Sequence, residues 1–142
     1  MNKVTSIIII EDERSFVMRF KLILQKVGIV MQGFKHFTNS EEAIAYYHQA
    51  QPEIVFLDIN LKGSPRDGME VLEYLKKEVK AGGKIGIIST SDNKQEIERC
   101  KALDGSFYIV KTGRINVFES RLRAFKKHFI EGDASEFMIF GK

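Results

Sequence analysis

The chain has 142 residues, of which 44% are hydrophobic and 29% charged, and its net charge is +3. The length is typical of one domain and the composition argues against disorder, while so small a net charge gives no indication of nucleic-acid binding. The single cysteine, Cys100, excludes an internal disulfide and suits a reducing compartment, and no apolar run approaches the roughly 18 residues that a membrane-spanning helix needs.

The first part of the chain predicts a strand, a helix and a second strand. Val4–Ile10 is β-branched and almost wholly apolar, which is typical of a strand covered on both faces. Apolar residues then recur at helical spacing from Phe16 to Val27, and Gly28 is a fitting helix stop. Val30–Phe37 mixes apolar with polar residues, so we expect an edge strand there.

The same alternation continues along the rest of the chain. Asn39 and Glu42 have the spacing of a capping box that opens a helix, and the run Ile54–Leu57 predicts a buried strand that ends at Asp58. The further predicted elements are a loop at Leu61–Gly68, a helix from Met69 that stops at Gly82-Gly83, a strand at Lys84–Ser89, a helix opened by an Asp92/Gln95 capping box and anchored by Ile97, Cys100 and Leu103, a strand at Ser106–Val110, and a helix striped by Phe118, Leu122, Phe125 and Phe129.

Five strand–helix repeats with short connections predict an α/β fold, in which helices cover both faces of a parallel sheet. We expect residues 131–142 to form a C-terminal tail, with no separate output domain. Four consecutive apolar residues, Phe137–Phe140, lie in this tail. Because such a run is a liability in water, we expect it to pack on this domain, on a second copy of the chain or on a partner.

Polar side chains stand at the carboxyl ends of the predicted strands, where open α/β sheets bind their ligands. They are Glu11–Glu13 after the first strand, Asp58 after the third, Ser89-Thr90-Ser91 after the fourth and Lys111 after the fifth. Clustered carboxylates repel one another, and a hard divalent cation such as Mg²⁺ removes the conflict. An aspartate can form an acyl phosphate, which a lysine and a hydroxyl then contact. This set predicts phosphoryl transfer to a carboxylate.

These residues lie in motifs that resemble the receiver domain of bacterial two-component response regulators. The motifs are Ile-Ile-Ile-Ile-Glu-Asp-Glu, Ile-Val-Phe-Leu-Asp with a following Asp-Gly, Ile-Ile-Ser-Thr and Phe-Tyr-Ile-Val-Lys, and the resemblance runs from Val4 to Ile130. It implies a receiver domain over residues 1–130, with a flavodoxin-like, doubly wound sheet of five parallel strands in the order 2-1-3-4-5 and five helices.

The resemblance also implies a role for each site residue. Asp58 is the expected phosphoacceptor, assisted by Ser89 and Lys111, and Ser89 with Tyr108 forms the expected switch. The expected Mg²⁺ ligands are the carboxylates of Glu11, Asp12 and Asp58 and the backbone carbonyl of Asn60.

The implied function is signalling in the cytoplasm. A sensor histidine kinase or a histidine phosphotransfer protein supplies phosphohistidine, and the phosphorylated chain switches a surface that binds a downstream protein. We expect no enzymatic activity beyond self-catalysed phosphotransfer and autodephosphorylation, and neither a nucleic acid nor a membrane as partner. A homodimer is a further candidate.

Three features depart from the family pattern. Glu11 stands where aspartate is commoner. Thr112-Gly113 follows Lys111 in place of the usual proline, and a cis peptide before Thr112 would cost roughly 3 kcal/mol, which favours a trans peptide there. The loop from Ile59 to Asp67 is about two residues longer than usual, with Lys62 where proline is frequent.

Two other functions stay open. One is a receiver-like adaptor that binds partners without being phosphorylated. The other is an Mg²⁺-dependent phosphatase with an aspartyl-phosphate intermediate, although Asn60 stands where such enzymes tend to carry a second aspartate. Neither a P-loop nor a G-x-G-x-x-G motif occurs, and His36, His48 and His128 show no zinc-site spacing.

A basic segment occupies the last predicted helix. Lys111–Ile130 holds six lysines or arginines and one glutamate. It is either a solvated helix face or a surface that steers an acidic partner. DNA is an alternative partner for this surface, but no recognition motif accompanies it.

Overall fold

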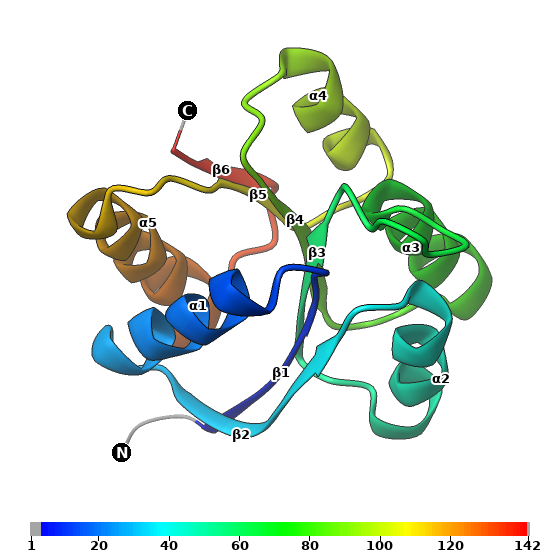
Figure 1. Ribbon diagram of the computed structural model, residues 1–142, viewed down its shortest axis with the longest axis horizontal. Coiled ribbons are helices and arrows are strands. Elements are labelled where there is room, and N and C mark those ends of the chain that lie inside the picture. Colours follow the sequence, from blue (N-terminus) through cyan, green and yellow to red (C-terminus); the bar gives the residue numbers. More distant parts are fainter. Residues whose placement is uncertain (1–3, 142) are drawn as a thin grey trace.

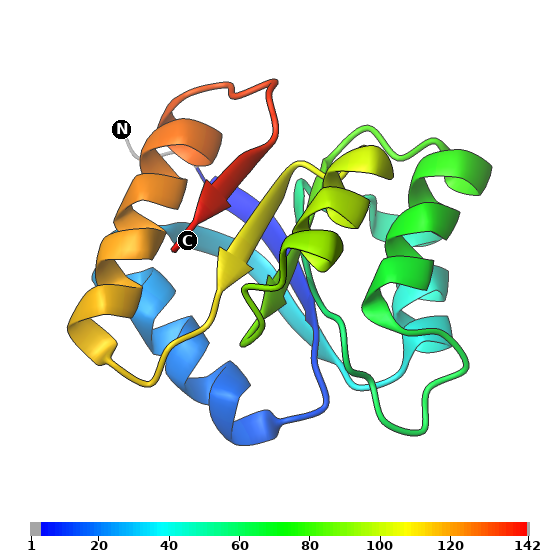
Figure 2. The same cartoon turned by 90° about the horizontal axis from the view of Figure 1, so that it is seen from above.

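A parallel sheet runs through the middle of the molecule, with helices on both of its faces (Figures 1 and 2). The structure is a computed structural model and describes residues 4–141. The strands are β1 (Val4–Ile10), β2 (Val30–Phe37), β3 (Ile54–Asp58), β4 (Lys84–Ser89), β5 (Phe107–Val110) and β6 (Met138–Phe140). The helices are α1 (Arg14–Lys26), α2 (Ser40–Ala50), α3 (Gly68–Tyr74), α4 (Lys94–Ala102) and α5 (Ile115–Lys126), and two π-helical turns, η1 (Leu75–Val79) and η2 (Lys127–Glu131), extend α3 and α5.

The prediction of a parallel α/β sheet with five helices is confirmed, but the predicted number of strands is wrong. Within residues 4–141 the sheet has six strands in the order β2-β1-β3-β4-β5-β6. The sixth comes from the apolar run of the expected tail and pairs in parallel with β5, with Tyr108 opposite Ile139. Parallel neighbours need a long crossover, which α5 and η2 provide. The added strand covers the open edge of β5 and buries Phe140.

The central strands are apolar because both of their faces are covered. One face packs against α1 and α5, where the ring of Phe20 lies 4.9 Å from that of Phe56 and the ring of Phe107 lies 4.9 Å from that of Phe125. The other face packs against α2, α3 and α4. Figure 2 shows α1 with α5 on one side of the sheet and α2 with α3 on the other. This double burial fixes the sheet, and with it the positions of the strand ends.

The helix starts agree with the sequence in part. Asn39 caps α2 as predicted, with its side chain accepting hydrogen bonds from two N–H groups of the first turn. The cap of α4 is Asn93, whose side chain accepts from the N–H of Gln95 at 2.8 Å, so the predicted Asp92 cap is wrong by one residue. A capping box that was not predicted, at Asp67, opens α3. Within residues 4–141, no helix combines the length and apolar character needed to cross a membrane.

Candidate functional site

The parallel register places the polar residues of the strand ends side by side. Ile10 of β1 lies opposite Leu57 of β3, so the residues that follow, Glu11 and Asp58, are neighbours at the carboxyl edge of the sheet. β4 and β5 end at the same edge, since the backbone N–H of Lys111 donates to the carbonyl of Ser89 at 2.7 Å. The expected site residues therefore come from four adjacent strands.

Three carboxylates form the centre of this edge. One oxygen each from Glu11, Asp12 and Asp58 lies within 4.8 Å of the others. Glu11 and Asp58 are nearly enclosed, with exposed residue fractions of 1% and 7%. A cavity of about 370 Å³ opens above them, and it is lined by Glu11, Asp12, Glu13, Asp58, Asn60, Lys62, Thr90 and Lys111.

Lys111 reaches into this cluster although no proline follows it. Its Nζ donates a hydrogen bond to Glu11 Oε1 and lies 3.7 Å from Asp58 Oδ1. The ammonium also stands 4.1 Å from the ring centre of Phe16, within the range of a cation–π contact. Every peptide bond among residues 4–141 is trans, including the one before Thr112. The lysine thus adopts its place beside Asp58 with a trans peptide.

The electrostatics of Asp58 are those of a crowded, buried acid. Burial is the largest influence that raises the pKa of Asp58 from its usual 3.8 to about 7, and a hydrogen bond with Glu11 and the charges of Glu11 and Asp12 add to it, while Lys111 acts in the opposite direction. The second carboxylate oxygen of Glu11, Oε2, is buried without a hydrogen-bond partner among residues 4–141. Three oxygen donors with one unsatisfied buried oxygen fit a hard divalent cation.

Ser89 is buried at the end of β4, and its expected role in the switch stays a prediction. It is 2% exposed, and its Oγ accepts a hydrogen bond from the N–H of Ser91 at 3.1 Å. The hydroxyl-bearing residue in the cavity wall is Thr90. Thr90 is one of the three residues, with Ser89 and Ser91, that the sequence places at the end of this strand.

Tyr108 is fully buried and lies close to the same backbone segment. Its hydroxyl donates a hydrogen bond to the carbonyl of Ser91 at 2.8 Å. Burial, as the main cause, raises the pKa of Tyr108 above its usual range. Ser89 and Tyr108 both form a hydrogen bond with the backbone of Ser91. A shift of Ser91 would therefore alter the hydrogen bonds of both expected switch residues.

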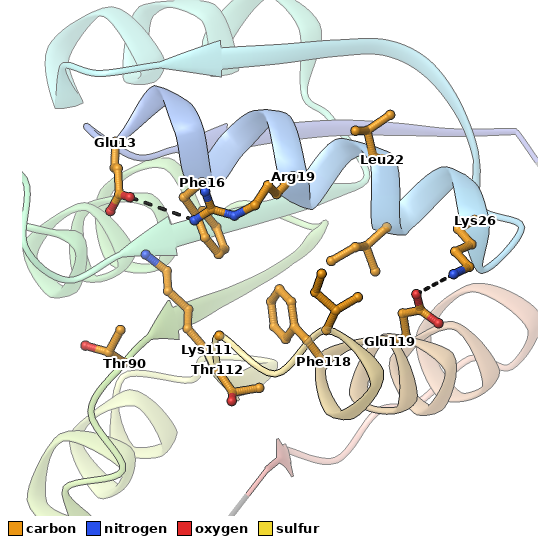
Figure 3. Close-up of a pocket in the computed structure, with 13 residues that line it drawn as sticks. Glu13, Phe16, Arg19, Leu22, Lys26, Thr90, Lys111, Thr112, Phe118 and Glu119 are labelled. Carbon is orange, nitrogen blue, oxygen red and sulfur yellow. Dashed lines mark ion pairs between the residues drawn. The ribbon is translucent and has the colours of Figure 1, made fainter.

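A second, larger cavity lies on the other side of Lys111, between α1 and the start of α5 (Figure 3). Its volume is about 590 Å³, and Lys111 and Thr90 line both cavities. Phe16 and Phe118, whose ring centres lie 6.0 Å apart, form part of its wall (Figure 3). Two ion pairs flank it, Arg19 with Glu13 at 3.9 Å and Lys26 with Glu119 at 2.8 Å.

Comparison with known proteins identifies the family. The sequence profile of the response regulator receiver domain matches residues 7–123. The chain belongs to this family. Receiver domains are the phosphoacceptors of two-component signalling rather than classical enzymes, they generally bind Mg²⁺, and they interact with histidine kinases or phosphotransfer proteins. No curated protein matches the sequence of this receiver domain.

Solved structures of response regulators share the fold. The Mn²⁺-bound form of Rcp1 is 19% identical with a TM-score of 0.78, and the match covers 92% of this chain and 98% of Rcp1. The phosphorylated cyanobacterial phytochrome response regulator RcpA is 22% identical with a TM-score of 0.78, over 93% of this chain and 97% of RcpA. The receiver domain of RcsB from Salmonella enterica serovar Typhimurium, with BeF₃⁻, is 17% identical with a TM-score of 0.74, over 96% and 94%.

Proposed function

We propose that this receiver domain takes a phosphoryl group from phosphohistidine onto Asp58 with the aid of Mg²⁺, and that the product switches a protein-binding surface. The observation that carries the proposal is the placement of Asp58 between two further carboxylates and the ammonium of Lys111. The Mn²⁺-bound form of Rcp1 and the phosphorylated form of RcpA support it as properties of proteins with the same fold.

Glu11, Asp12 and Asp58, with the backbone carbonyl of Asn60, would hold the cation. When bound, Mg²⁺ neutralises charge on the carboxylates and on the incoming phosphoryl oxygens. A carboxylate oxygen of Asp58 forms the new bond to phosphorus. The bond from phosphorus to the donor imidazole breaks, and its electron pair returns to the imidazole nitrogen, which takes up a proton. Lys111 pairs with the transferred phosphoryl group, and the hydroxyl of Ser89 or Thr90 can donate a hydrogen bond to it.

The donor protein would approach beside the second cavity. Met18, Leu22 and Ile115 are exposed by 70%, 64% and 58%, which is high for large apolar side chains. Leu22 and Ile115 line the cavity that shares Lys111 with the acidic site. A histidine kinase or phosphotransfer protein bound on α1 and the start of α5 would therefore bring its phosphohistidine to the mouth over Asp58. Since such donors phosphorylate in the cytoplasm, the proposal places the chain there.

The switch would run from Ser89 through Ser91 to Tyr108. A phosphoryl group on Asp58 adds negative charge beside Lys111. It therefore competes with the present partners of Lys111 and of the Ser89 hydroxyl for these two groups. The nearby helix α4 has only Ile97 and Cys100 among its buried residues, so few contacts hold it in place. We expect the movement to reach α4 and β5, where it changes the binding surface.

The output surface would combine α4, β6 and α5 in place of an exposed β5. Ile139 of β6 is 38% exposed and lies opposite Tyr108 in the register. Part of the basic charge of α5 is used within the molecule: Arg121 donates to the carbonyl of Val110 at 2.7 Å, and Arg123 lies 3.9 Å from Glu119. Lys126 also lies 3.9 Å from Glu131, so Arg114 and Lys127 are the cations expected to steer an acidic downstream protein.

The proposal is tested by incubating the protein with acetyl phosphate and Mg²⁺ and recording the intact mass. One phosphoryl group should be added to the wild type and none to Asp58→Asn. Asp12→Ala should not be phosphorylated at the native rate. Glu13→Ala is the matched control, because Glu13 lines the cavity but stands outside the carboxylate cluster. Absence of the adduct with every small-molecule donor and histidine kinase would favour the unphosphorylated adaptor, and rapid turnover of phosphomonoesters would favour the phosphatase.

A further inference from the structure

The long loop that follows Asp58 is tied to the start of α2. Figure 1 shows α2 and α3 next to each other on one face of the sheet, and residues 59–67 connect β3 to α3 along this side. The loop carries Asn60 and Lys62, which line the acidic cavity. Contacts that fix this loop therefore also fix part of the cavity wall.

Ser40, the first residue of α2, makes two of these contacts. Its backbone N–H donates to Ser64 Oγ at 2.9 Å, and its own Oγ accepts a hydrogen bond from the N–H of Arg66 at 3.2 Å. Ser40 is 0% exposed. Because the Ser40 end of each bond is enclosed, loss of the bond leaves a buried polar group poorly satisfied, which makes these bonds more valuable than similar bonds on the surface.

A second set of contacts ties the same loop from outside. Arg66 Nη1 donates to both carboxylate oxygens of Glu41, at 2.8 and 2.9 Å, and Ser40 Oγ donates to Glu41 Oε2 at 2.9 Å. The guanidinium of Arg66 also lies 4.5 Å from the ring centre of Tyr74 in α3. Since Arg66 and Glu41 are partly exposed, this ion pair is the weaker anchor.

A backbone hydrogen bond joins the two ends of the loop. The N–H of Gly68 donates to the carbonyl of Ile59 at 3.1 Å. A Cβ atom at Gly68 would lie 2.2 Å from the carbonyl oxygen of Asp58, so α3 begins directly against the backbone of the expected phosphoacceptor. Asn60 lies between this fixed point and the anchors at Ser64 and Arg66.

We infer that Ser40 is a positioning residue of the cation site, a role that rests on the proposed phosphoacceptor function. It touches neither the carboxylates nor the phosphoryl group. Its backbone N–H holds the loop at Ser64, and its Oγ, the group that Ser40→Ala removes, holds the loop at Arg66 and so helps to keep Asn60 at the cavity wall. The pair of Arg66 and Glu41 supports the same arrangement from the surface.

The test compares Ser40→Ala with Ser6→Ala. Ser6 is a matched control, because its Oγ also accepts a backbone N–H, that of Glu53 at 2.9 Å, but at the opposite end of β1 from Glu11. Mg²⁺ affinity is measured by NMR titration of the amide signals of Asp58 and Asn60, and phosphorylation by acetyl phosphate is measured at saturating Mg²⁺. Ser40→Ala should weaken Mg²⁺ binding about fivefold and alter the saturated rate much less, whereas Ser6→Ala should lower only the melting temperature.

Equal Mg²⁺ affinity in Ser40→Ala and wild type, or equal weakening in Ser6→Ala, would overturn the inference. Arg66→Ala serves where Ser40→Ala folds poorly, because this partly exposed residue should shift Mg²⁺ affinity in the same direction by a smaller factor. Failure of the proposed function looks different: the wild type itself would neither bind Mg²⁺ nor accept a phosphoryl group, and both proposals would fall together.

Discussion

Lys111 Nζ lies 3.7 Å from Asp58 Oδ1 while it donates a hydrogen bond to Glu11. The lysine therefore stabilises two carboxylates that would otherwise repel each other at close range. It also occupies the position from which an ammonium can pair with a phosphoryl group on Asp58. The positive charge of Lys111 therefore has two opposite effects. It favours a phosphoryl group on Asp58, and it competes with a metal cation for the carboxylate oxygens of Glu11 and Asp58.

Lys111→Met should separate these two effects. Removing the positive charge should tighten Mg²⁺ binding, because less repulsion opposes the cation, and it should slow phosphorylation by acetyl phosphate at least about tenfold, because the phosphoryl oxygens lose their partner. NMR titration with Mg²⁺ and timed mass spectra measure the two quantities. Weaker Mg²⁺ binding together with an unchanged rate would contradict the assigned role of Lys111.

The raised pKa of Asp58 predicts how the cation-free protein responds to pH. The folded state holds the Asp58 proton up to about pH 7, whereas the unfolded chain releases it near pH 3.8. The contribution of Asp58 to stability is thus most favourable at low pH and is lost as the pH rises to 7. At pH 8 its buried charge should cost on the order of 4 kcal/mol.

Asp58→Asn should therefore raise the melting temperature in EDTA strongly at pH 8 and little at pH 5. Thermal unfolding at both pH values measures this difference, and Asp104→Asn, at an exposed position, is the control. A difference that is equal at the two pH values would show that the Asp58 carboxylate is not destabilised by its surroundings.

The sixth strand should contribute measurably to stability. Phe140 is 5% exposed, and its ring centre lies 5.9 Å from that of Phe125 and 6.1 Å from that of Phe129. Phe140→Ala should cost about 3 kcal/mol, or roughly 6–12 °C in melting temperature, because it opens a cavity in this cluster. Ile139→Ala should cost much less. Equal, small effects of both substitutions would show that β6 is not packed in solution.

The proposed switch predicts where the backbone responds to activation. With Mg²⁺ and beryllofluoride, amide hydrogen exchange should change across Ser89–Leu103 and at Tyr108, because Ser91 links the two hydroxyl side chains and α4 is held by few buried contacts. Tyr108→Phe removes the bond to Ser91 and should alter exchange in this region without the activator. Changes limited to the loop after Asp58 would contradict this route.

The sequence predicts the acidic site well because strand ends follow from composition. Apolar runs stop at Glu11, Asp58 and Lys111, and a parallel sheet brings such ends to one edge regardless of side-chain detail. The sequence places Ser89, Thr90 and Ser91 together at this edge, but composition does not indicate which of them lines the cavity. Thr90 lines the cavity, whereas Ser89 Oγ accepts a hydrogen bond from the N–H of Ser91.

The sixth strand could not be predicted from its local sequence. Three residues, Met138–Phe140, are too few for a recognisable alternation, and their pairing with Phe107–Ile109 depends on contacts about thirty residues apart. The anchoring of the loop after Asp58 was missed for the same reason. The sequence indicates only that Ser40 lies at the start of a helix. Its hydrogen bonds with Ser64 and Arg66 depend on the tertiary structure.

The most direct test of the account is to locate the acceptor. The protein is phosphorylated with a phosphorylated histidine kinase or acetyl phosphate in Mg²⁺, then treated with borohydride, which reduces an acyl phosphate to an alcohol, and its peptides are analysed by mass spectrometry. Homoserine is expected at position 58, with none in a sample prepared in EDTA and none at any other aspartate. A stable phosphoryl group on another residue, or an unmodified Asp58 under all of these conditions, would contradict the assignment of Asp58 as the acceptor.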